Sequence, residues 1–281
     1  MRNKSILVSG CSSGIGRCVA LGLRDRGYRV FATARRNRDI ARLEQSGLTA
    51  VRLHVDDPAS VADAASQVLA ASGGHVYGLF NNAAYGQPGA VEDLSWEALE
   101  AQLRTNLLGW HELTRRLIPG MRERGEGRII QNSSVLGLVA MPYRGAYNCS
   151  KFALEGLSDT LRLELHGSGI WVSLIEPGPI SSRFRENAHA KFKQYIDAEN
   201  SVHRDNYRAM QQRLEKQGPT TGFTLPPEAV LKKVIHALES PRPRARYAVT
   251  TPTYIFAALR RLLSTRQLDW VLRKASGGGG R

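Results

Sequence analysis

The sequence predicts an α/β fold: one Rossmann-type domain built on a doubly wound, parallel, seven-stranded sheet. Two observations predict it. Short apolar runs alternate with helical patterns of about ten or more residues, and a glycine-rich turn follows the first apolar run. Strands that helices cover on both faces read as continuous apolar runs, as these do. We therefore expect residues 1–281 to form a single domain.

Strands are expected at the short apolar runs, and helices where apolar residues recur at helical spacing. The expected strands are 6–9, 28–34, 49–55, 76–80, 128–132, 170–175 and 245–249. The expected helices are 15–26, 37–45, 59–71, 95–124, 146–166 and 226–238. Ser95 suits the N-cap of the longest helix, with Glu97 and Glu100 in its first turn. Pro226 and Pro227 suit the start of the last helix.

The pattern changes after Pro177. Residues 183–222 are polar, charged and poor in strand signal, and they end in the turn residues Gly218, Pro219 and Gly222. We expect this segment to be a substrate lid. Residues 251–276 are expected to form a basic, helical C-terminal tail, because residues 254–274 are amphipathic.

The net charge of +14 is the conspicuous bulk property, with 39 Lys and Arg against 25 Asp and Glu. Such an excess suits nucleic acid, an anionic membrane surface or a phosphorylated ligand. The sequence contains no recognised nucleic-acid-binding motif, and its basic residues are not interleaved with stacking aromatics, so we expect no nucleic-acid partner. Part of the excess gathers instead at residues 35–38 and 242–274.

The remaining composition indicates a cytoplasmic protein without a metal site. Cys11, Cys18 and Cys149 have no paired spacing and suit free thiols in a reducing compartment. The first apolar run is too short for the core of a signal peptide, and no run approaches the ~18 residues of a membrane span. The seven histidines are scattered, without HxH or HExxH, so we expect no metal.

A glycine-rich turn, residues 9–16, lies between the first expected strand and the first expected helix. Glycines there allow a tight turn and let the backbone approach a pyrophosphate, while the next helix offers free N–H groups and its positive dipole end. The GxxxGxG spacing differs from the common GxGxxG fingerprint, so a turn without a ligand stays open as an alternative. The expected dinucleotide contacts are Gly10, Ser12, Ser13, Gly14, Ile15 and Gly16.

The end of the second expected strand predicts which dinucleotide is bound. In NAD-dependent folds, an acidic residue ~20 positions after the glycines holds the ribose 2′-hydroxyl. Here Arg35 and Arg36 stand at that place, and no acid precedes Asp39. A guanidinium binds a 2′-phosphate with charge-assisted bonds, whereas a carboxylate repels it. We therefore expect NADP(H), held by Arg35 and Arg36; the alternative is a solvated basic loop.

Tyr147 and Lys151 are spaced i and i+4, which places both side chains on one face of a helix. A free tyrosine has a pKa of about 10, and a nearby ammonium is expected to lower the pKa of Tyr147 toward neutral. Ser134 stands 13 residues earlier, near the end of an expected strand, where such folds bind ligands. Any helix can carry Tyr-x-x-x-Lys by chance, but with Ser134 and the glycine turn it predicts a proton-relay site.

These residues together resemble the short-chain dehydrogenase/reductase family over about residues 5–182. The turn Asn81-Asn82-Ala83, the pair Asn106 and Gly109, and the segment 177–182 add to the resemblance. The resemblance implies a catalytic tetrad of Asn106, Ser134, Tyr147 and Lys151. It also implies cofactor contacts at Val55, Asp56, Asn82, Ala83, Tyr147, Lys151, Pro177, Gly178, Ile180 and Ser182.

Within the family, residues 8–16 and 146–157 look like the branch of retinol and 17β-hydroxysteroid dehydrogenases. Residues 176–184 and 244–251 look most like bacterial NADP-dependent aldehyde reductases of that branch. Three residues depart from the family pattern. Ala84 replaces a glycine, which puts the backbone of that turn in question; His54 replaces an Asp that contacts adenine; and Ser9 replaces Thr but keeps a hydroxyl.

The resemblance implies an NADP(H)-dependent oxidoreductase that reduces the carbonyl of a lipophilic aldehyde or ketone, or oxidises the matching alcohol. It implies that Ser134 and Tyr147 hold the carbonyl oxygen and that Tyr147 donates the proton. Lys151 then binds the nicotinamide ribose and tunes Tyr147, while Asn106 helps to hold a relay water. Two alternatives stay open: a 3-oxoacyl thioester reductase, and a non-enzymatic NADP(H)-binding sensor, which is expected to lack Tyr147 or Lys151.

The substrate pocket and the partners are the last expectations. Candidate pocket residues are Leu136, Met141, Tyr143, Phe184 and Asn187, which are mostly apolar. By resemblance, the long helices around Asn106 and Tyr147 pair between subunits, which implies a homodimer or homotetramer. The basic tail either makes a weak peripheral contact with an anionic membrane or packs on its own domain with a solvated basic face.

Overall fold

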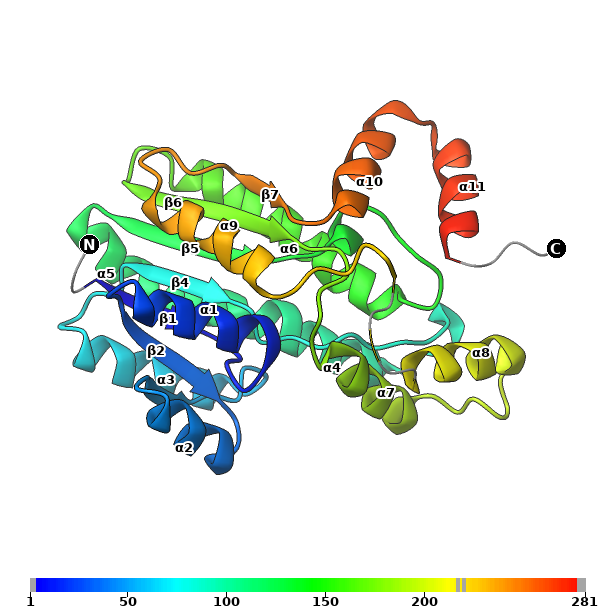
Figure 1. Cartoon of the computed structure of the whole chain (residues 1–281), viewed down its shortest axis with the longest axis horizontal. Coiled ribbons are helices and arrows are strands. Elements are labelled where there is room, and N and C mark those ends of the chain that lie inside the picture. Colours follow the sequence, from blue (N-terminus) through cyan, green and yellow to red (C-terminus); the bar gives the residue numbers. More distant parts are fainter. Residues whose placement is uncertain (1–3, 216–217, 219–220, 277–281) are drawn as a thin grey trace.

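The computed structural model describes residues 4–215, 218 and 221–276, and it contains a sheet of seven parallel strands (Figure 1). The strands are β1 (Ser5–Val8), β2 (Arg29–Ala34), β3 (Thr49–Arg52), β4 (Gly78–Asn81), β5 (Gly127–Asn132), β6 (Ile170–Glu176) and β7 (Arg246–Ala248). Their order is β3-β2-β1-β4-β5-β6-β7. The winding reverses between β1 and β4, and open α/β sheets bind ligands at such a reversal. The predicted fold class is confirmed.

Helices cover both faces of the sheet and continue beyond its carboxyl edge (Figure 1). The α-helices are α1 (Gly14–Asp25), α2 (Asn37–Gln45), α3 (Pro58–Ala71), α4 (Trp96–Leu103), α5 (Gly109–Arg124), α6 (Gly145–Glu164), α7 (Phe184–Tyr195), α8 (Arg204–Glu215), α9 (Glu228–Glu239), α10 (Thr251–Leu262) and α11 (Thr265–Ala275). Short helical turns are η1 (Val91–Asp93), η2 (Arg104–Leu108) and η3 (Val135–Gly137).

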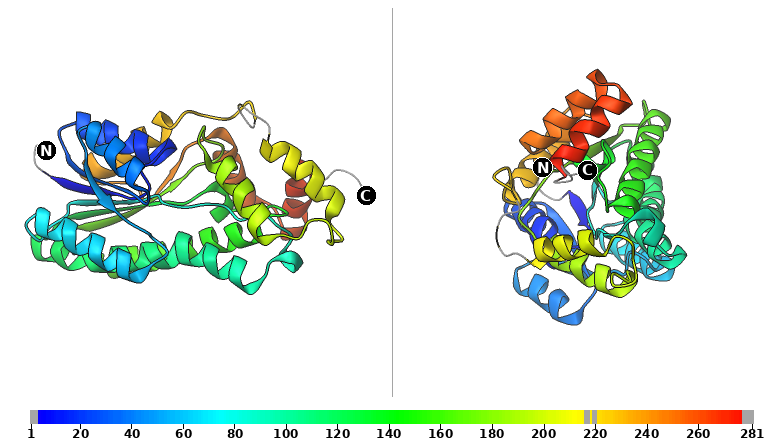
Figure 2. Two further views of the ribbon diagram at one scale, coloured as in Figure 1. Left: turned by 90° about the horizontal axis from the view of Figure 1, so that it is seen from below. Right: turned by 90° about the vertical axis from the view of Figure 1, so that its right-hand side faces the viewer.

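Two apolar cores lie on the two faces of the sheet, and the helices that supply them are seen on opposite sides in Figure 2. One core packs α1, α2 and α9 against the sheet, and the other packs α3, α5 and α6. In β1, Ile6 and Val8 belong to the first core and Leu7 to the second. A strand buried on both faces needs apolar residues at every position, which is why β1 reads as a continuous apolar run.

The helix predicted over residues 95–124 is not continuous. It is divided into α4, the π-helical turn η2 and α5. After the π turn, a Cβ on Gly109 would lie 1.7 Å from the carbonyl oxygen of Val55, so only glycine allows this approach of α5. Such π turns occur frequently at functional sites, and this one carries Asn106. β3 also ends earlier than predicted, at Arg52, where its partner strand β2 ends at Ala34.

Residues 183–222, the predicted lid, contain α7 and α8, which pack together beyond the carboxyl ends of the strands (Figure 2). Phe192, Tyr207 and Met210 form a small separate core there with Ala90. Ala90 N–H donates to the Tyr207 hydroxyl at 2.9 Å, which ties the segment to the main domain. Residues 216–217 and 219–220 of the predicted lid lie outside the described residues.

The basic tail folds as α10 and α11, which are separated by Leu263 and Ser264. Ser264 and Gln267 form a capping box that starts α11. Leu272 packs with Val135 and Val139, so the tail lies on the turn that follows β5. Within the part of the chain that is described, no helix is both long and apolar enough to cross a membrane.

Candidate active site

Glycines shape the turn after β1. Gly10 and Gly14 have φ values of +73° and +54°, in the left-handed region that disfavours side chains. A Cβ on Gly16 would lie 2.2 Å from the carbonyl oxygen of Gly10. The N-cap Ser13 makes no side-chain capping bond to the first turn of α1. This backbone cradle at a helix N-terminus fits a pyrophosphate, and it brings together the predicted contacts Gly10, Ser12, Ser13, Gly14, Ile15 and Gly16.

The turn after β4 is fastened to the glycine turn. Ser9 Oγ accepts hydrogen bonds from the backbone N–H groups of Asn82 and Ala83, at 2.8 and 3.0 Å. The Asn82 side chain donates to the Ser9 carbonyl at 3.0 Å and accepts from the Asn132 side chain at 2.9 Å. The hydroxyl that Ser9 retains therefore joins the turn after β4 to the glycine turn. Ala84 does not have a positive φ, so this turn does not require glycine there.

Arg35 and Arg36 are exposed at the end of β2, beside the glycine turn. Cys11 N–H donates to the Thr33 carbonyl at 2.7 Å and so holds the end of β2 against that turn. Within the described residues neither arginine forms an ion pair, because Asp39 lies close to Arg38 and Arg42 instead. Two guanidinium groups without a counter-charge thus stand next to the cradle.

The structure adds another cation here, Lys191 of α7, which sequence reasoning missed. Burial lowers the pKa of Lys191, and the positive charge of Arg35 lowers it further, so the two charges lie near each other. The Lys191 ammonium lies 5.1 Å from the ring centres of both Tyr85 and Tyr195. No sequence signal marks Lys191, because it lies in the polar segment 183–222 and in no recognised motif.

The loop after β3 and the segment after β6 carry the other predicted cofactor contacts. Val55 is buried, whereas Asp56 and His54 are exposed. A Cβ on Gly14 would lie 3.0 Å from the Cβ of Ser182, so the segment after β6 lies against the glycine turn. The predicted contacts in that segment are Pro177, Gly178, Ile180 and Ser182.

Tyr147 and Lys151 lie one turn apart on α6, and both are buried. Tyr147 shares a hydrogen bond with the Ser134 side chain. Lys151 Nζ donates to the carbonyl of Asn132 at 2.8 Å and lies 4.3 Å from the ring centre of Trp110. The end of β5 and one face of α6 therefore bring the predicted Ser134, Tyr147 and Lys151 together.

Burial sets the protonation of both groups on α6. It raises the pKa of Tyr147 to about 12, and the hydrogen bond with Ser134 offsets only part of this. It lowers the pKa of Lys151 to about 7, against the opposing charge of Glu155. The prediction that Lys151 lowers the pKa of Tyr147 is therefore wrong in direction, because burial has the larger effect. At neutral pH Tyr147 holds its proton and is ready to donate it.

Asn106 is fully buried in η2 and is linked to α6. Its Oδ1 accepts from Tyr85 N–H at 3.2 Å, and its Nδ2 donates to the Tyr85 carbonyl at 2.9 Å. Nδ2 also donates to Ser150 Oγ at 3.2 Å, next to Lys151 in the chain. Through Ser150, Asn106 is thus linked to α6, the helix that carries Tyr147 and Lys151.

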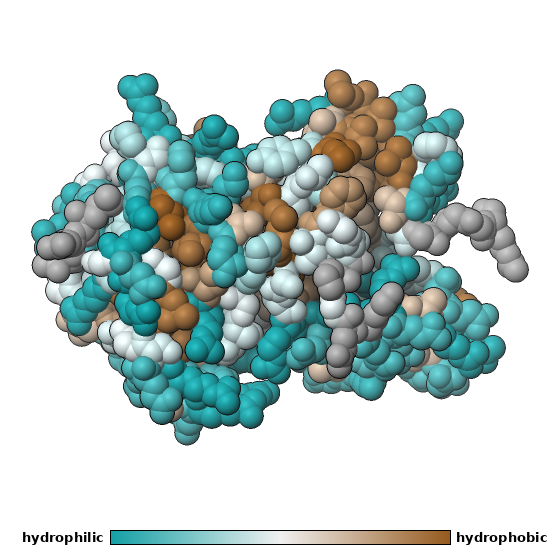
Figure 3. Space-filling model, viewed as in Figure 1, coloured by the Kyte–Doolittle hydropathy of each residue, from teal (hydrophilic) through white to brown (hydrophobic). Residues whose placement is uncertain are grey.

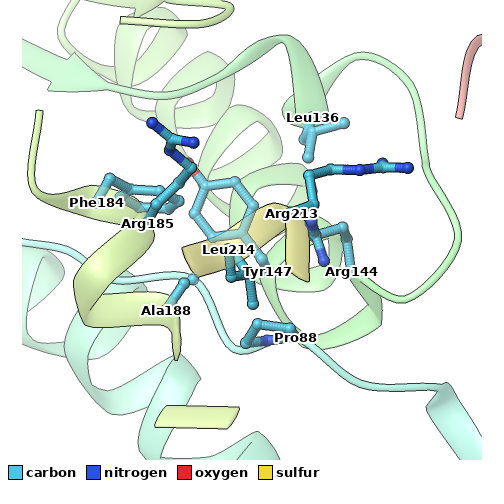
Figure 4. A pocket seen from close by; sticks show the side chains of 10 residues that line it. Pro88, Leu136, Arg144, Tyr147, Phe184, Arg185, Ala188, Arg213 and Leu214 are labelled. Atoms are coloured by element: carbon cyan, nitrogen blue, oxygen red, sulfur yellow. The ribbon is translucent and has the colours of Figure 1, made fainter. Parts of the chain in front are cut away.

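A cavity of about 150 Å³ opens beside Tyr147 (Figure 4). The predicted Leu136 and Phe184 line it, and the rings of Phe184 and Tyr147 pack edge to face, 5.5 Å apart. Met141, Tyr143 and Asn187, also predicted, are not among its lining residues. The lining residues that the prediction missed are Gly86, Pro88, Arg144, Arg185, Ala188, Arg213 and Leu214.

A half-buried cluster of charges lies behind α6, and sequence reasoning missed it as well. Arg246 of β7 pairs with Glu155, with Asp159 at 2.5 Å and with Glu176 at 3.0 Å. Burial, followed by the charge of Glu155, raises the pKa of Glu176 to about 7. The cluster joins α6, one turn after Lys151, to the ends of β6 and β7. Single-sequence patterns do not pair residues so far apart in the chain.

Comparison with known proteins identifies the family. Residues 4–193 match the family described as short chain dehydrogenase. The chain belongs to the short-chain dehydrogenase family. It is 44% identical over 270 residues to the protein named uncharacterized oxidoreductase YbbO of Escherichia coli K12, covering 96% of this chain and 94% of that one. It is 32% identical over 265 residues to human 17-beta-hydroxysteroid dehydrogenase type 1, covering 89% of this chain and 78% of that one.

Solved structures of this family have the same fold. A short-chain dehydrogenase/reductase from Burkholderia phymatum, in complex with NAD, superposes with a TM-score of 0.79 at 25% identity, covering 97% of this chain and 95% of that one. Actinorhodin polyketide ketoreductase with NADPH gives a TM-score of 0.72 at 26% identity, covering 89% and 97%. This short-chain dehydrogenase is thus an oxidoreductase of a family that uses nicotinamide cofactors. Relatives occur with either dinucleotide, so the choice between NAD and NADP rests on residues of this chain.

Proposed function

We propose that this short-chain dehydrogenase is an NADP(H)-dependent enzyme that reduces the carbonyl group of a lipophilic aldehyde or ketone, or oxidises the matching alcohol. The observation that carries the proposal is Tyr147, a buried and protonated phenol bonded to Ser134 at the wall of a largely apolar cavity. A bound nicotinamide supplies the hydride for the carbonyl carbon.

Tyr147 is the proton donor in this proposal. Its pKa of about 12 keeps the phenol protonated at neutral pH, and Ser134 orients the hydroxyl. Two hydroxyl donors, Ser134 and Tyr147, hold the substrate oxygen and stabilise the negative charge that develops on it. Lys151, held by the Asn132 carbonyl, binds the ribose hydroxyls of the cofactor and stabilises the phenolate after the proton has left. Asn106 holds a relay water through the acceptor position that remains free on Oδ1.

The preference for NADP(H) is assigned to Arg35 and Arg36. Both guanidinium groups lie beside the glycine cradle, with no carboxylate of residues 4–215, 218 or 221–276 at ion-pair distance, and the nearest acid along the chain, Asp39, lies close to other arginines. A 2′-phosphate supplies the anion that these groups lack, whereas the 2′-hydroxyl of NAD(H) does not. Lys191, close to Arg35, adds to the positive potential at this place.

The lipophilic part of the substrate is assigned to the cavity wall. Leu136, Phe184 and Leu214 line the cavity next to Tyr147. Met141, Tyr143 and Asn187 stay candidates for the part of a longer substrate that extends beyond the cavity. Relatives that carry 17-beta-hydroxysteroid dehydrogenase in their name agree with a lipophilic substrate class.

The decisive experiment is Tyr147→Phe, with NADPH consumption measured over medium-chain aldehydes, steroids and acyl thioesters. We expect the variant to lose turnover and to keep binding NADPH, measured by the fluorescence of the bound dinucleotide. Tyr254→Phe is the matched control, because the exposed Tyr254 hydroxyl only donates to the Ala248 carbonyl. Turnover by Tyr147→Phe at the wild-type rate would overturn the assignment, and turnover of acyl thioesters alone would replace the substrate class.

The proposed assembly is a homodimer or homotetramer. Apolar side chains are exposed on the elements around Asn106 and Tyr147: Trp96 of α4, Leu108 of η2, and Leu157 and Leu163 of α6. A second copy of the chain that packs on α5 and α6 would cover such side chains. Light scattering coupled to size exclusion tests this, and Leu157→Arg should shift the mass toward the monomer.

The proposed location is the cytoplasm, with a weak contact of the tail at an anionic membrane surface. Cys11, Cys18 and Cys149 are free thiols, which suits a reducing compartment. Figure 3 shows apolar side chains gathered over α10 and α11, and Leu262 and Trp270 are exposed there among Arg261, Arg266 and Lys274. Cell fractionation tests the first proposal. Co-sedimentation with phosphatidylserine vesicles at low salt tests the second, and failure to sediment overturns it.

A further inference from the structure

The cavity beside Tyr147 combines apolar walls with cationic side chains. Among its described lining residues are Arg144, Arg185 and Arg213, and none of the lining residues is acidic. Figure 4 shows the three arginines around the same hollow as Tyr147. A pocket for a neutral, lipophilic substrate gains nothing from guanidinium groups, and a half-buried guanidinium such as that of Arg144 costs desolvation energy unless it is paired. The arginines therefore require an explanation.

Arg144 lies on the turn into α6, three residues before Tyr147, and is only partly exposed. It donates to the carbonyl of Tyr143 at 3.0 Å and to the sulfur of Met210 at 3.3 Å. No carboxylate lies within ion-pair distance of it in the part of the chain that is described. Five N–H donors in a fork are thus served by one carbonyl and one weak sulfur acceptor.

Arg213 of α8, whose side chain is exposed, brings a second positive charge to the rim of the same cavity. Among the described residues it has no hydrogen-bond or ion-pair partner. Burial lowers the pKa of Arg144, and the positive charge of Arg213, which lines the same cavity, lowers it further, so the two guanidinium groups repel each other. Two repelling cations with free donors form a site that an anion would stabilise.

We propose that the substrate of this enzyme carries a carboxylate at the end of its apolar chain, and that Arg144 and Arg213 bind this carboxylate while Tyr147 meets the carbonyl. The inference rests on the proposed function and deepens it, because it narrows a lipophilic aldehyde or ketone to an oxocarboxylic acid. Arginine forks match the geometry of a carboxylate. The apolar wall formed by Leu136 and Leu214 receives the carbon chain.

The size of the cavity limits the chain. An enclosed space of ~150 Å³ holds a benzene-sized ligand, and the cavity here has about 150 Å³. A chain of roughly six carbons therefore fits within it. ω-Oxo carboxylates of about six to ten carbons include chains that fit the cavity and chains that extend beyond it, and the n-aldehydes of equal length are their neutral counterparts.

The test compares kcat/KM for each ω-oxo carboxylate with kcat/KM for its n-aldehyde, in the wild-type enzyme with saturating NADPH. We expect the carboxylate to be preferred by about tenfold or more, the range of a charge-assisted hydrogen bond. Arg213→Gln should lower this ratio by about tenfold, and Arg213→Glu should reverse the preference. Arg122→Gln is the control of equal charge, because Arg122 is exposed at the far end of α5; it should leave the ratio unchanged.

The outcomes separate this inference from the function on which it rests. Equal kcat/KM for both members of every pair overturns the inference and leaves carbonyl reduction intact, whereas no turnover of either class overturns carbonyl reduction itself. A carboxylate preference that both Arg213 variants retain also overturns the inference. Competition against aldehyde reduction adds a second readout: alkyl carboxylates should inhibit more strongly than alkyl phosphates of equal length, and the opposite order would overturn the choice of a carboxylate.

Discussion

The side chain of Asn106 forms hydrogen bonds with both backbone polar groups of Tyr85: its Oδ1 accepts from the N–H at 3.2 Å and its Nδ2 donates to the carbonyl at 2.9 Å. Gln102, one turn earlier, donates to the same carbonyl at 2.9 Å and accepts from Gln87 N–H at 2.6 Å. Two amides at the junction of α4 and the π turn thus fix the loop that leads into the cavity. Asn106 alone continues the chain of bonds to Ser150 on α6.

Asn106→Ala should therefore reduce both stability and activity. It leaves the buried N–H of Tyr85 without its acceptor, at ~1–3 kcal/mol, whereas the Tyr85 carbonyl keeps its bond from Gln102, and it removes the bond to Ser150. Gln102→Ala is the matched control, since it removes two hydrogen bonds from the same loop and none from α6. We expect similar losses of unfolding free energy by urea denaturation, and a loss of kcat/KM at least about tenfold greater for Asn106→Ala. Equal losses of kcat/KM would show that Asn106 acts only through the loop.

The sequence predicts those parts of the site that depend on local patterns. Tyr147 and Lys151 share a helix face because they are spaced i and i+4. Gly10 and Gly16 indicate the cradle because its tight backbone leaves no room for side chains at these positions. The π turn at Asn106 was not predictable, because no residue type in 104–108 marks the change from i→i−4 to i→i−5 hydrogen bonds.

Features that depend on how distant segments pack were missed. Arg144 and Arg213 meet only because α8 packs near the start of α6, and the polar segment that carries α8 has no family pattern. The direction of the Tyr147 pKa was wrong for the same reason: burial depends on the whole fold, whereas the distance to Lys151 depends on the helix alone. The types and spacing of the site residues were therefore predictable from the sequence, whereas the burial and the neighbouring charges that set their pKa values were not.

Replacing Arg36 should change the choice of dinucleotide. Arg36→Ala removes a guanidinium that forms no ion pair with any residue that the structure describes, so we expect the KM for NADPH to rise by about tenfold and the KM for NADH to stay the same. Arg38→Ala is the control, because Arg38 lies 4.0 Å from Asp39. A parallel rise for both dinucleotides would indicate that Arg36 shapes the loop and does not select the 2′-phosphate.

Gly16→Ala should abolish dinucleotide binding. Its Cβ would lie 2.2 Å from the Gly10 carbonyl oxygen and 2.6 Å from Asn82 Nδ2, so the cradle must open to admit it. Gly222→Ala is the control, because no atom lies within 4 Å of its Cβ and its φ is not positive; we expect it to be neutral or to stabilise by up to ~1 kcal/mol. The measurements are NADPH fluorescence titration and Tm. Wild-type affinity in Gly16→Ala would contradict the placement of the cofactor.

The pH dependence of stability should reflect two buried groups with opposite signs. The pKa of Glu176 is raised to about 7 from 4.5, so the folded state holds a proton that the unfolded state has lost between these values. Stability from this group is complete below pH 4.5 and is lost as the pH rises through 7. The pKa of Lys151 is lowered from 10.5 to about 7, so the unfolded state binds the extra proton and stability rises between pH 7 and 10.5.

The summed contribution of Glu176 and Lys151 to the free energy of unfolding should therefore be lowest near pH 7. Each unit of pKa shift contributes at most roughly 1.4 kcal/mol. Glu176→Gln keeps a neutral side chain of the same shape. In this variant the free energy of unfolding should no longer fall between pH 4.5 and 7, whereas its rise above pH 7 should remain. Lys151→Met should do the reverse. Glu44→Gln, at an exposed carboxylate of α2, should alter neither limb. Urea denaturation at half-unit pH steps measures these slopes. If the free energy of unfolding still falls between pH 4.5 and 7 in Glu176→Gln, another carboxylate causes the fall. Glu155 is then the first to examine, because burial raises its pKa in the same cluster.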